Sequence, residues 1–326
     1  MDGKGILEYL GDDWVRMGAL MRSSLESDID LLNWTNAFIL DHGGKQLRPL
    51  LSLLMGRACS SAALMEDTLR FAAATELLHN ATLLHDDVAD GSMIRRGAPT
   101  VASLLDPAHS VLVGDYWLVK AVNLVLDADR NVLEVVRLFA GTLSSLAEGE
   151  MFQLQKASSA DTSEDDYLRI IHDKTGSLFE TACLSAAISV EASQDARQAA
   201  GEYARNLGLA FQIKDDILDY TGSDIGKPVG VDIREGKITL PLLGALERVD
   251  GVEQARIRDK VRQVSAHPEY IGEIMDFVRE HDGVGYAQER LLVLSARAKD
   301  SLSPLPDSPA KDYLAALAAF TVEREK

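Results

Sequence analysis

Two clusters of aspartate are the residues of this sequence best suited to chemistry. One lies at residues 86–90 and the other, with the same internal spacing, at residues 215–219, and each ends an apolar run of helical periodicity. Aspartates four residues apart share one face of a helix, where like charges are destabilising by roughly a few tenths of a kcal/mol per pair. A divalent cation offsets this repulsion, and ligands that are all oxygen favour Mg²⁺ or Mn²⁺. We name the clusters the first aspartate motif (Asp86, Asp87, Asp90) and the second aspartate motif (Asp215, Asp216, Asp219).

A single motif of this kind is typical of a solvated acidic face on a surface helix. Two motifs of identical spacing, separated by a domain-sized stretch of chain, favour a different interpretation. We predict that they face each other and hold several metal ions around an oligophosphate, because Mg²⁺ commonly completes its coordination with one or two carboxylates and substrate phosphates.

Basic side chains near the first motif could neutralise phosphate charge. Lys45 and Arg48 lie near the start of a helix that Pro49 should open, and the N-terminal end of a helix attracts anions. Arg95 and Arg96 follow the first motif, and planar guanidinium groups suit bidentate contacts with phosphate. Either pair alone would also be common at an ordinary solvated corner of a helical protein.

Further candidate groups lie near the second motif. Lys174 and Thr175 interrupt a helical run, and an interruption of this kind exposes polar atoms in the middle of a bundle. A glycine-rich segment, residues 222–243, follows the second motif and carries Lys227 and Lys237. Since glycine keeps such a loop pliable, both lysines could fold back over the acidic end of the preceding helix.

His79 lies seven residues before Asp86 and therefore on nearly the same helical face, two turns away. A lone histidine on such a face is usually a core residue. Glu76 and His79 also form a Glu-x-x-His pattern, as di-iron bundles do. Those bundles need a second such pattern, and none of the other six histidines has a glutamate three residues before it, so we exclude a di-iron site.

Composition and periodicity predict an all-α protein. The chain has 326 residues, 46% of them hydrophobic, and its apolar residues recur mostly at helical spacing, while alternating β-branched runs are scarce. No linker is visible, so we expect a single domain over residues 1–326. The formal charge of −18 argues against nucleic acid or an anionic membrane as the main partner, and phosphate binding would then depend on local cations.

Cysteine content and the first residues bear on the compartment. Cys59 and Cys183 are too few for a disulfide framework, and the opening stretch MDGKGILEYLGDDW lacks the charged and apolar regions of a secretory signal. We therefore expect a cytoplasmic location. No uninterrupted apolar run reaches the ~18 residues that a membrane-spanning helix needs.

Hydrophobic periodicity and capping residues predict a succession of helices. Ser163 and Asp166 should form a capping box at the start of one of them. The terminal residues 324–326 are expected to fray. The predicted helices occupy residues 5–26, 29–40, 65–90, 109–126, 131–157, 163 to 174–176, 195–221, 239–249, 252–265, 268–281, 283–301 and 308–321.

Together these motifs resemble those of the trans-isoprenyl diphosphate synthases. Residues 43–49 match the GGKxxRP pattern of that family, both aspartate motifs match its DDxxD pattern, and residues 226–242 match GKPxGxDxxEGKxTLPL. The resemblance covers roughly residues 40–245. It implies one large antiparallel helical bundle around a central cavity, with the two DDxxD motifs facing each other. One departure is Gly91, because related long-chain enzymes often carry an acidic residue there.

The resemblance also implies roles for individual residues. The diphosphate of isopentenyl diphosphate would be bound by Lys45, Arg48, His79 and Arg96. The allylic diphosphate would be bound by Arg95, Lys174, Thr175, Gln212, Lys227 and Lys237. Three Mg²⁺ ions, for which Mn²⁺ could substitute, would be held by Asp86, Asp90, Asp215 and Asp219. The residues implied in catalysis are Asp86, Asp87, Asp90, Asp215, Asp216, Lys174 and Lys237.

The residues just before the first motif bear on product length. In the resembled family, aromatic side chains four or five positions before this motif stop chain growth early. Here those positions are Thr82 and Ala81, and Leu78, Leu77 and Ala74 continue the same face. The fifth position lies roughly 7.5 Å along the helix from the motif. Since none of these side chains is aromatic, we predict a long all-trans product similar to octaprenyl diphosphate.

Three alternatives stay open. A synthase of farnesyl or geranylgeranyl length would share all of these motifs. A class I terpene cyclase shares the fold, but its second metal motif normally mixes Asn or Asp, Ser or Thr, and Glu. A non-catalytic subunit of a heteromeric synthase would be expected to have lost some of the charged residues. The implied partners are isopentenyl diphosphate, an allylic diphosphate such as farnesyl diphosphate, a second copy of the chain, and at most a transient membrane contact during product release.

Overall fold

The computed structural model describes residues 3–60, 64–222 and 229–324. It is helical almost throughout, which confirms the predicted all-α class. In these residues the only strands are β1 (Ile94–Arg95) and β2 (Ala98–Pro99), which form one antiparallel hairpin. The helices are α1 (Gly3–Leu10), α2 (Asp12–Ser24), α3 (Asp30–Asp41), α4 (Leu47–Cys59), α5 (Glu66–Ala89), α6 (Val101–Leu104), α7 (Pro107–Leu126), α8 (Val132–Ser159), α9 (Glu164–Ile171), the π-helical turn η1 (His172–Gly176), α10 (Ser177–Ser189), α11 (Gln194–Thr221), α12 (Val231–Arg234), α13 (Leu240–Leu246), α14 (Gly251–Gln263), α15 (Tyr270–Glu280), α16 (Gly283–Ser301) and α17 (Pro309–Glu323).

The chain forms two compact units that alternate along the sequence. Unit 1 consists of Met1–Gly141, Thr181–Gly201 and Pro304–Leu314, and unit 2 consists of Thr142–Glu180, Glu202–Ser303 and Ala315–Lys326. Helices α8, α10, α11 and α17 contribute residues to both units. The single domain expected from the sequence stays a prediction.

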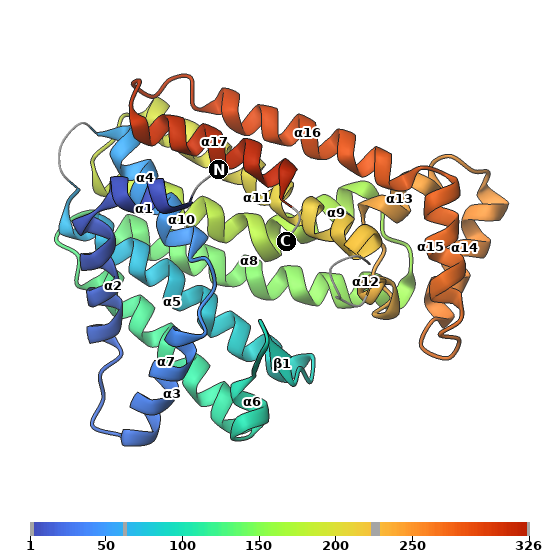
Figure 1. Cartoon of the computed structure of the whole chain (residues 1–326), viewed down its shortest axis with the longest axis horizontal. Coiled ribbons are helices and arrows are strands. Elements are labelled where there is room, and N and C mark those ends of the chain that lie inside the picture. The colour runs from blue at the N-terminus through green and yellow to red at the C-terminus, as the bar shows by residue number, and fades with distance from the viewer. Residues whose placement is uncertain (1–2, 61–63, 223–228, 325–326) are drawn as a thin grey trace. The chain divides into compact units, whose positions relative to one another are not determined.

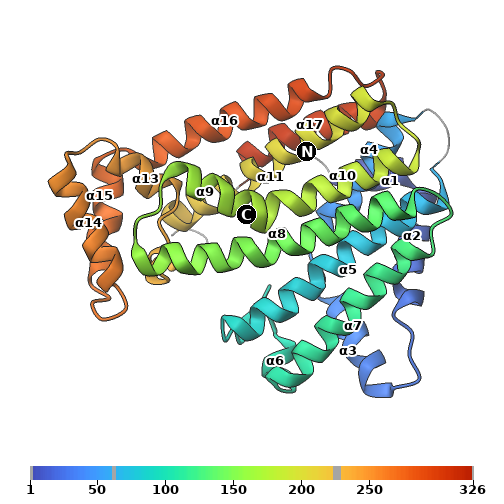
Figure 2. The same cartoon turned by 180° about the vertical axis from the view of Figure 1, so that it is seen from behind.

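In unit 1, α5 is the helix around which the others are arranged, and it packs against α2, α4 and α7 (Figure 1, Figure 2). Its middle turns are buried on almost every side and are rich in alanine and leucine, and the side chains of Ala72, Ala73 and Ala74 are completely buried. A helix of this composition needs partners all round, and its small side chains let neighbouring helices approach closely. This packing fixes the helix whose C-terminal end carries the first aspartate motif.

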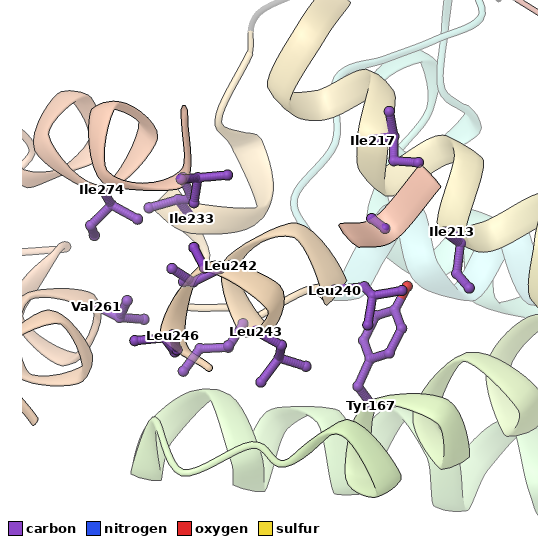
Figure 3. Packing of buried hydrophobic residues seen from close by; sticks show 14 of the residues in the cluster. Tyr167, Ile213, Ile217, Ile233, Leu240, Leu242, Leu243, Leu246, Val261 and Ile274 are labelled. Atoms are coloured by element: carbon purple, nitrogen blue, oxygen red, sulfur yellow. The ribbon is translucent and has the colours of Figure 1, made fainter. Parts of the chain in front are cut away.

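In unit 2, the short helix α13 lies within the hydrophobic core. All seven of its residues are buried, and Pro241 stands in its first turn, where a missing backbone N–H leaves no hydrogen bond unmade. Its leucines point among residues of α12, α14 and α15, while Leu240 lies beside Tyr167 of α9 (Figure 3). The core thereby joins the helix that precedes the Lys174 turn to the segment that follows the second motif.

Most of the predicted helices are confirmed with small shifts of their ends, and the capping box of α9 is confirmed. The Ser163 N–H donates to Asp166 Oδ2 at 3.0 Å, and the Asp166 N–H donates to Ser163 Oγ at 3.1 Å. The prediction of one helix at 5–26 is wrong. Helices α1 and α2 are separated at Gly11, whose φ of 52° is a left-handed conformation that favours glycine.

The expectation of a frayed C-terminus is wrong for Arg324. Its side chain is only 8% exposed, and it packs within unit 2. Residues 325 and 326 lie outside the described residues. Across the ranges that the structure does describe, we find no helix with the length and apolar character to cross a membrane.

Candidate active site

The first aspartate motif lies at the C-terminal end of α5. Asp86 is partly exposed and Asp90 is exposed, whereas Asp87 is only 4% exposed. Arg95 Nε donates a hydrogen bond to Asp87 Oδ1 at 2.7 Å. Burial raises the pKa of Asp87, and this hydrogen bond opposes the rise. The middle aspartate is therefore held by an arginine, and its two neighbours are the members presented toward the surface of unit 1.

The hairpin after α5 supplies both arginines. Arg95 pairs with Ala98 across the hairpin, and the two residues of its turn, Arg96 and Gly97, have φ values of 53° and 79°. Two consecutive residues with positive φ are typical of a tight hairpin turn, which Gly97 favours. The guanidinium of Arg96 lies against Gly44, where an added Cβ would meet its Cζ at 2.5 Å. The hairpin thus brings Arg96 to the segment that carries Lys45 and Arg48.

The residues implied to bind isopentenyl diphosphate form one basic cluster in unit 1. Burial, together with the charge of Arg96, lowers the pKa of Arg48 to about 10, and Glu76 opposes this shift. Burial and the charges of Arg48, Arg96 and Arg95 lower the pKa of His79 well below its usual range, so the imidazole is neutral at pH 7. Glu76 is 3% exposed and supplies the opposite charge. Lys45 lies three residues before Arg48 in the sequence, and its side chain is exposed.

The second aspartate motif lies near the C-terminal end of α11, and its middle residue is again the most buried. Asp216 is 4% exposed, and it accepts hydrogen bonds from the Tyr167 hydroxyl at 2.6 Å and from Gln212 Nε2 at 2.9 Å. Thr175 Oγ1 donates to Gln212 Oε1 at 2.9 Å. Burial raises the pKa of Asp216 well above its usual value, and the charges of Asp232 and Asp215 add to the rise. Asp216 therefore anchors a chain of hydrogen bonds that reaches Thr175.

Asp215 is paired with the C-terminal end of the chain. Arg324 Nη2 donates to Asp215 Oδ1 at 2.8 Å and to the Phe211 carbonyl at 2.7 Å. The guanidinium carbon lies 3.9 Å from the centre of the Phe211 ring, within the range of a cation–π interaction. Lys214 Nζ donates to the Val322 carbonyl at 2.8 Å, so the last turn of α17 and the residue after it are each fastened to α11. Arg324 was not predicted as a site residue.

Asp219 caps the short helix α12. Its Oδ1 accepts the N–H of Val231 and its Oδ2 accepts the N–H of Asp232, both at 3.1 Å. The turn into α12 is made by Gly230, whose φ of 71° suits glycine. This cap directs the segment after α12, where Lys237 forms an ion pair with Glu235. Burial and the charge of Asp219 raise the pKa of Asp232 to about 6.

Lys174 and Thr175 lie in η1, between α9 and α10. The interruption that the sequence predicts is confirmed as a π-helical turn. Lys174 Nζ lies 2.6 Å from Glu150 Oε2 on α8. Turns of this kind are frequent at functional sites because they displace side chains from the regular helical faces.

A cavity of about 90 Å³ in unit 2 brings several of these residues together. Its lining includes ammonium groups, neutral hydrogen-bonding groups, the carboxylates of Asp216 and Asp232, and apolar side chains such as Ile170 and Ile238. Four of the six residues implied to bind the allylic diphosphate are among them, namely Lys174, Thr175, Gln212 and Lys237. Arg95 belongs to unit 1, and Lys227 lies outside the described residues.

Comparison with known proteins decides the family. The sequence model of the polyprenyl synthetase family matches residues 30–278. This chain belongs to the polyprenyl synthetase family. It is 37% identical to the octaprenyl diphosphate synthase of Haemophilus influenzae over 321 residues, which cover 98% of this chain and 96% of that protein. Membership in the polyprenyl synthetase family confirms the predicted prenyltransferase.

Solved structures agree with this assignment to the polyprenyl synthetase family. A decaprenyl diphosphate synthase from Rhodobacter capsulatus has a TM-score of 0.91 at 34% identity, with 99% of each chain covered. A polyprenyl synthase from Caulobacter crescentus CB15, complexed with calcium and isoprenyl diphosphate, has a TM-score of 0.89 at 31% identity, with 98% of this chain and 97% of that chain covered. Both comparisons extend over nearly the whole chain, including the residues beyond the family match.

The carboxylates of the two aspartate motifs supply some of the oxygen ligands that a hard cation such as Mg²⁺ needs. Among the side chains that the structure describes, no three His, Cys, Asp or Glu residues converge as a complete metal site. Mg²⁺ usually keeps several waters and is bound by one or two carboxylates together with substrate phosphates. The pairs Asp86 with Asp90 and Asp215 with Asp219 supply oxygen ligands of this kind, so they fit Mg²⁺ that is shared with a diphosphate.

The predicted chain-length residues are mostly buried in unit 1. Ala81 is 1% exposed, and Leu77 and Leu78 are completely buried. Thr82 is partly exposed, and its hydroxyl donates to the His79 carbonyl at 2.8 Å. The absence of aromatic side chains at these positions is a property of the sequence, and their role in product length stays a prediction.

The sequence did not predict two residues that contact the second aspartate motif, Tyr167 and Arg324. Tyr167 lies seven residues before Lys174, which places both near one face of a helical run, and this spacing could have identified it. Arg324 carries no such signal. It lies more than a hundred residues from Asp215 in the sequence, and only the packing of α17 on α11 brings the two together.

Proposed function

We propose that this prenyltransferase condenses isopentenyl diphosphate head to tail (1′-4) onto an allylic diphosphate such as farnesyl diphosphate, giving a long all-trans product similar to octaprenyl diphosphate. The observation that carries this proposal is the cavity of unit 2. Three separate elements line it with Lys174, Thr175, Gln212 and Lys237. Two ammonium groups beside the Gln212 amide, which keeps one N–H besides the one it donates to Asp216, are suited to a diphosphate. The identity of 37% with an octaprenyl diphosphate synthase supports the long product.

The second substrate is assigned to unit 1. Arg96 lies close enough to lower the pKa of both Arg48 and His79, and the charge of buried Glu76 opposes the shift of Arg48. Neutral His79 can donate one hydrogen bond to a phosphate oxygen, while the arginines supply positive charge. We assign the diphosphate of isopentenyl diphosphate to this cluster together with Lys45.

Lys174 and Lys237 stabilise the negative charge that develops on the allylic diphosphate as its carbon–oxygen bond breaks. The double bond of isopentenyl diphosphate then attacks the allylic carbon, a carbon–carbon bond forms, and the departing diphosphate takes the proton that is lost. No protein nucleophile is needed. Mg²⁺, when bound, supplies further positive charge to the leaving group. We infer that Asp86, Asp90, Asp215 and Asp219 hold three Mg²⁺ ions, for which Mn²⁺ can substitute. The action of both motifs on one diphosphate stays a prediction.

The surface of α7 supports a homodimer. Leu112, Val119 and Leu126 are exposed on this helix at intervals of seven residues. Apolar side chains at this interval form a stripe along one helical face, which suits packing against another helix. We therefore assign this stripe to a second copy of the chain. Size-exclusion chromatography should show a dimer for the wild type and a monomer for Leu112→Glu combined with Val119→Glu, and a monomeric wild type would contradict the assignment.

The two cysteines are consistent with the proposed cytoplasmic location. Cys59 and Cys183 are not joined in a disulfide, as expected in a reducing compartment. We propose at most a transient membrane contact, during release of the long product.

Product chromatography tests the proposed function. Purified chain, Mg²⁺, farnesyl diphosphate and labelled isopentenyl diphosphate should give a product of octaprenyl-like length. Ala81→Phe should shorten the product, while Ala81→Ser should not. Because Ala81 is 1% exposed, the larger ring should also cost about 1–3 kcal/mol of folding free energy, so the melting temperature of each variant is measured in parallel.

The same assay separates the alternatives. Wild-type products of farnesyl or geranylgeranyl length would identify a shorter-chain synthase, and would overturn the long-chain proposal. A cyclised hydrocarbon would identify a terpene cyclase. No turnover by the isolated, folded chain would point to a non-catalytic subunit.

A further inference from the structure

The turn η1 holds Lys174 and Thr175 in an unusual backbone geometry. The N–H of Ser177 donates to the His172 carbonyl, five residues back, which is the hydrogen bond of a π-turn. Such turns are rare and occur mostly as single turns within α-helices, so the surroundings must favour this one. Two helices, α8 and α11, come close to it with the parts of them that belong to unit 2.

On α8, the close approach occurs at Gly149. A Cβ added there would lie 2.7 Å from Asp173 Cβ and 3.2 Å from the Lys174 nitrogen. The next residue along α8, Glu150, contacts Lys174 Nζ through Oε2 at 2.6 Å. Gln153 Nε2 donates to the other carboxylate oxygen of Glu150 at 3.0 Å, which fixes the orientation of that carboxylate.

On α11, the close approach occurs at Gly208. A Cβ added there would lie 2.8 Å from the Cα of Gly176, the last residue of the turn. One helical turn later, Gln212 accepts the hydrogen bond of Thr175 at 2.9 Å, on the same face of α11. Each helix therefore presents the same pair of features: a glycine where the backbone touches η1, and a polar side chain that binds the neighbouring functional residue.

We propose that Gly149 and Gly208 are positioning residues that set the location of Lys174 and Thr175, and through them the location of the allylic diphosphate. This inference rests on the proposed function, because it takes those two residues as diphosphate ligands. A methyl group at either glycine must push η1 away from its supporting helix. The contacts of Glu150 with Lys174 and of Gln212 with Thr175 would then lengthen on the affected side.

The chain offers a matched control on each helix. Gly141 on α8 has no atom within 4 Å of an added Cβ, and Gly201 on α11 has only ordinary contacts with Leu184, the nearest at 3.4 Å. Gly141→Ala and Gly201→Ala should therefore leave the kinetics unchanged and raise the melting temperature slightly, since alanine favours a helix over glycine. Gly149→Ala and Gly208→Ala make the same substitution at the two positions where the helices contact η1.

The Michaelis constants of both substrates are measured separately for all four variants, with kcat and melting temperature. Gly149→Ala and Gly208→Ala should raise KM for farnesyl diphosphate by about tenfold and leave KM for isopentenyl diphosphate within about twofold, because a displacement of an ångström is costly only for the group that is displaced. Equal changes in both constants, or kinetics equal to the controls, would overturn the proposal.

A second variant decides the matter if the alanine variants do not fold. Glu150→Gln keeps the side-chain size and removes the charge that holds Lys174. It should raise KM for farnesyl diphosphate alone. A lower KM would mean that Glu150 competes with the substrate for Lys174, and an unchanged KM would mean that the contact is irrelevant; both results would overturn the proposal.

The assay also separates this inference from the proposed function. If the wild type makes no polyprenyl product, the proposed function fails. The rise in melting temperature that inorganic diphosphate and Mg²⁺ produce then tests the turn directly. That rise should be smaller for Gly149→Ala and Gly208→Ala than for the two controls, and equal rises would overturn the inference.

Discussion

The two aspartate motifs have the same spacing, but their partners come from different distances along the chain. In the first motif, Asp87 is held by Arg95, eight residues away. In the second, Asp216 is held by Tyr167, 49 residues away, and Asp215 by Arg324, 109 residues away. The first motif is thus organised by a helix end and the hairpin that follows it. The second depends on the packing of three helices.

The motifs also have a feature in common that their spacing explains. The middle aspartate is 4% exposed in both, while the flanking aspartates are more exposed. Adjacent residues point about 100° apart on a helix, so a motif whose first and last members face outward turns its second member toward the core. A buried carboxylate needs hydrogen-bond partners, which explains why Asp87 and Asp216 are both held. Their implied part in catalysis stays a prediction, and their contacts suit a positioning role.

The largest expected effect tests whether both motifs are needed. Asp86→Ala and Asp215→Ala should each lower kcat by about a thousandfold or more, since each removes a ligand that would stabilise the departing diphosphate. Circular dichroism should show unchanged helical content. Asp165→Ala, at an exposed position of α9, is the control and should retain full activity. Near-normal turnover of either motif variant would mean that one motif suffices.

The next effect tests the distant partner of the second motif. Arg324→Gln removes the charged hydrogen bond to Asp215, and such bonds contribute about 1.5–3 kcal/mol. Two Mg²⁺ concentrations should rise by about tenfold or more. One is the concentration for half-maximal activity, and the other is the concentration for half-maximal thermal stabilisation in the presence of inorganic diphosphate. Arg324→Lys should recover part of the loss.

The control for Arg324→Gln is Lys214→Met. It removes the hydrogen bond to the Val322 carbonyl, which fastens the same segment to α11, and it leaves the contact with Asp215 in place. Its Mg²⁺ dependence should match the wild type. A Mg²⁺ requirement that falls in Arg324→Gln would show that the arginine competes with the metal for Asp215 and does not position this carboxylate for it.

A smaller effect tests cooperation between the motifs. Mg²⁺ alone should raise the melting temperature slightly, because it offsets repulsion within each motif. Mg²⁺ with inorganic diphosphate should raise it much more, since a ligand at a hundred times its dissociation constant stabilises the folded state by about 2.7 kcal/mol. Differential scanning fluorimetry measures both shifts. Equal shifts with and without diphosphate would indicate two independent motifs.

The smallest effect concerns the crowding of carboxylates near the second motif. Burial and Asp219 raise the pKa of Asp232 from 3.8 to about 6 in the folded chain. A raised pKa means that the folded state binds the proton more tightly, so this group's favourable contribution is present below pH 3.8 and is lost as the pH rises to about 6. Asp232→Asn should therefore unfold at higher denaturant concentration than the wild type at pH 7 without metal.

The advantage of Asp232→Asn should shrink as the pH is lowered from about 6 toward 3.8 and disappear below it. Urea unfolding at several pH values measures this difference. Asp165→Asn, which changes the net charge by the same amount at an exposed site, serves as the control. A gain for Asp232→Asn that does not depend on pH would exclude Asp232 as its source.

The sequence by itself determined the all-α class, most of the helices, the capping box at Ser163 and the family. These features depend on residues close together in the chain. Helical periodicity, a cap three residues from its partner and a motif of five residues all express local geometry, so they can be read without knowing the fold. The prediction of one helix at 5–26 was wrong for a local reason too. Gly11 has a positive φ, which interrupts the helix, and the residues around it did not indicate this.

Only the tertiary structure decided which groups hold the aspartates and the lysine-threonine turn. The ion pair of Arg324 with Asp215, the hydrogen bond of Tyr167 to Asp216, and the approach of Gly149 and Gly208 to η1 all join residues far apart in sequence. The sequence around Arg324 would be the same whether its side chain were buried or exposed. What distinguishes them is the packing of α17 on α11, which excludes water and leaves the carboxylate and the aromatic ring as the available partners.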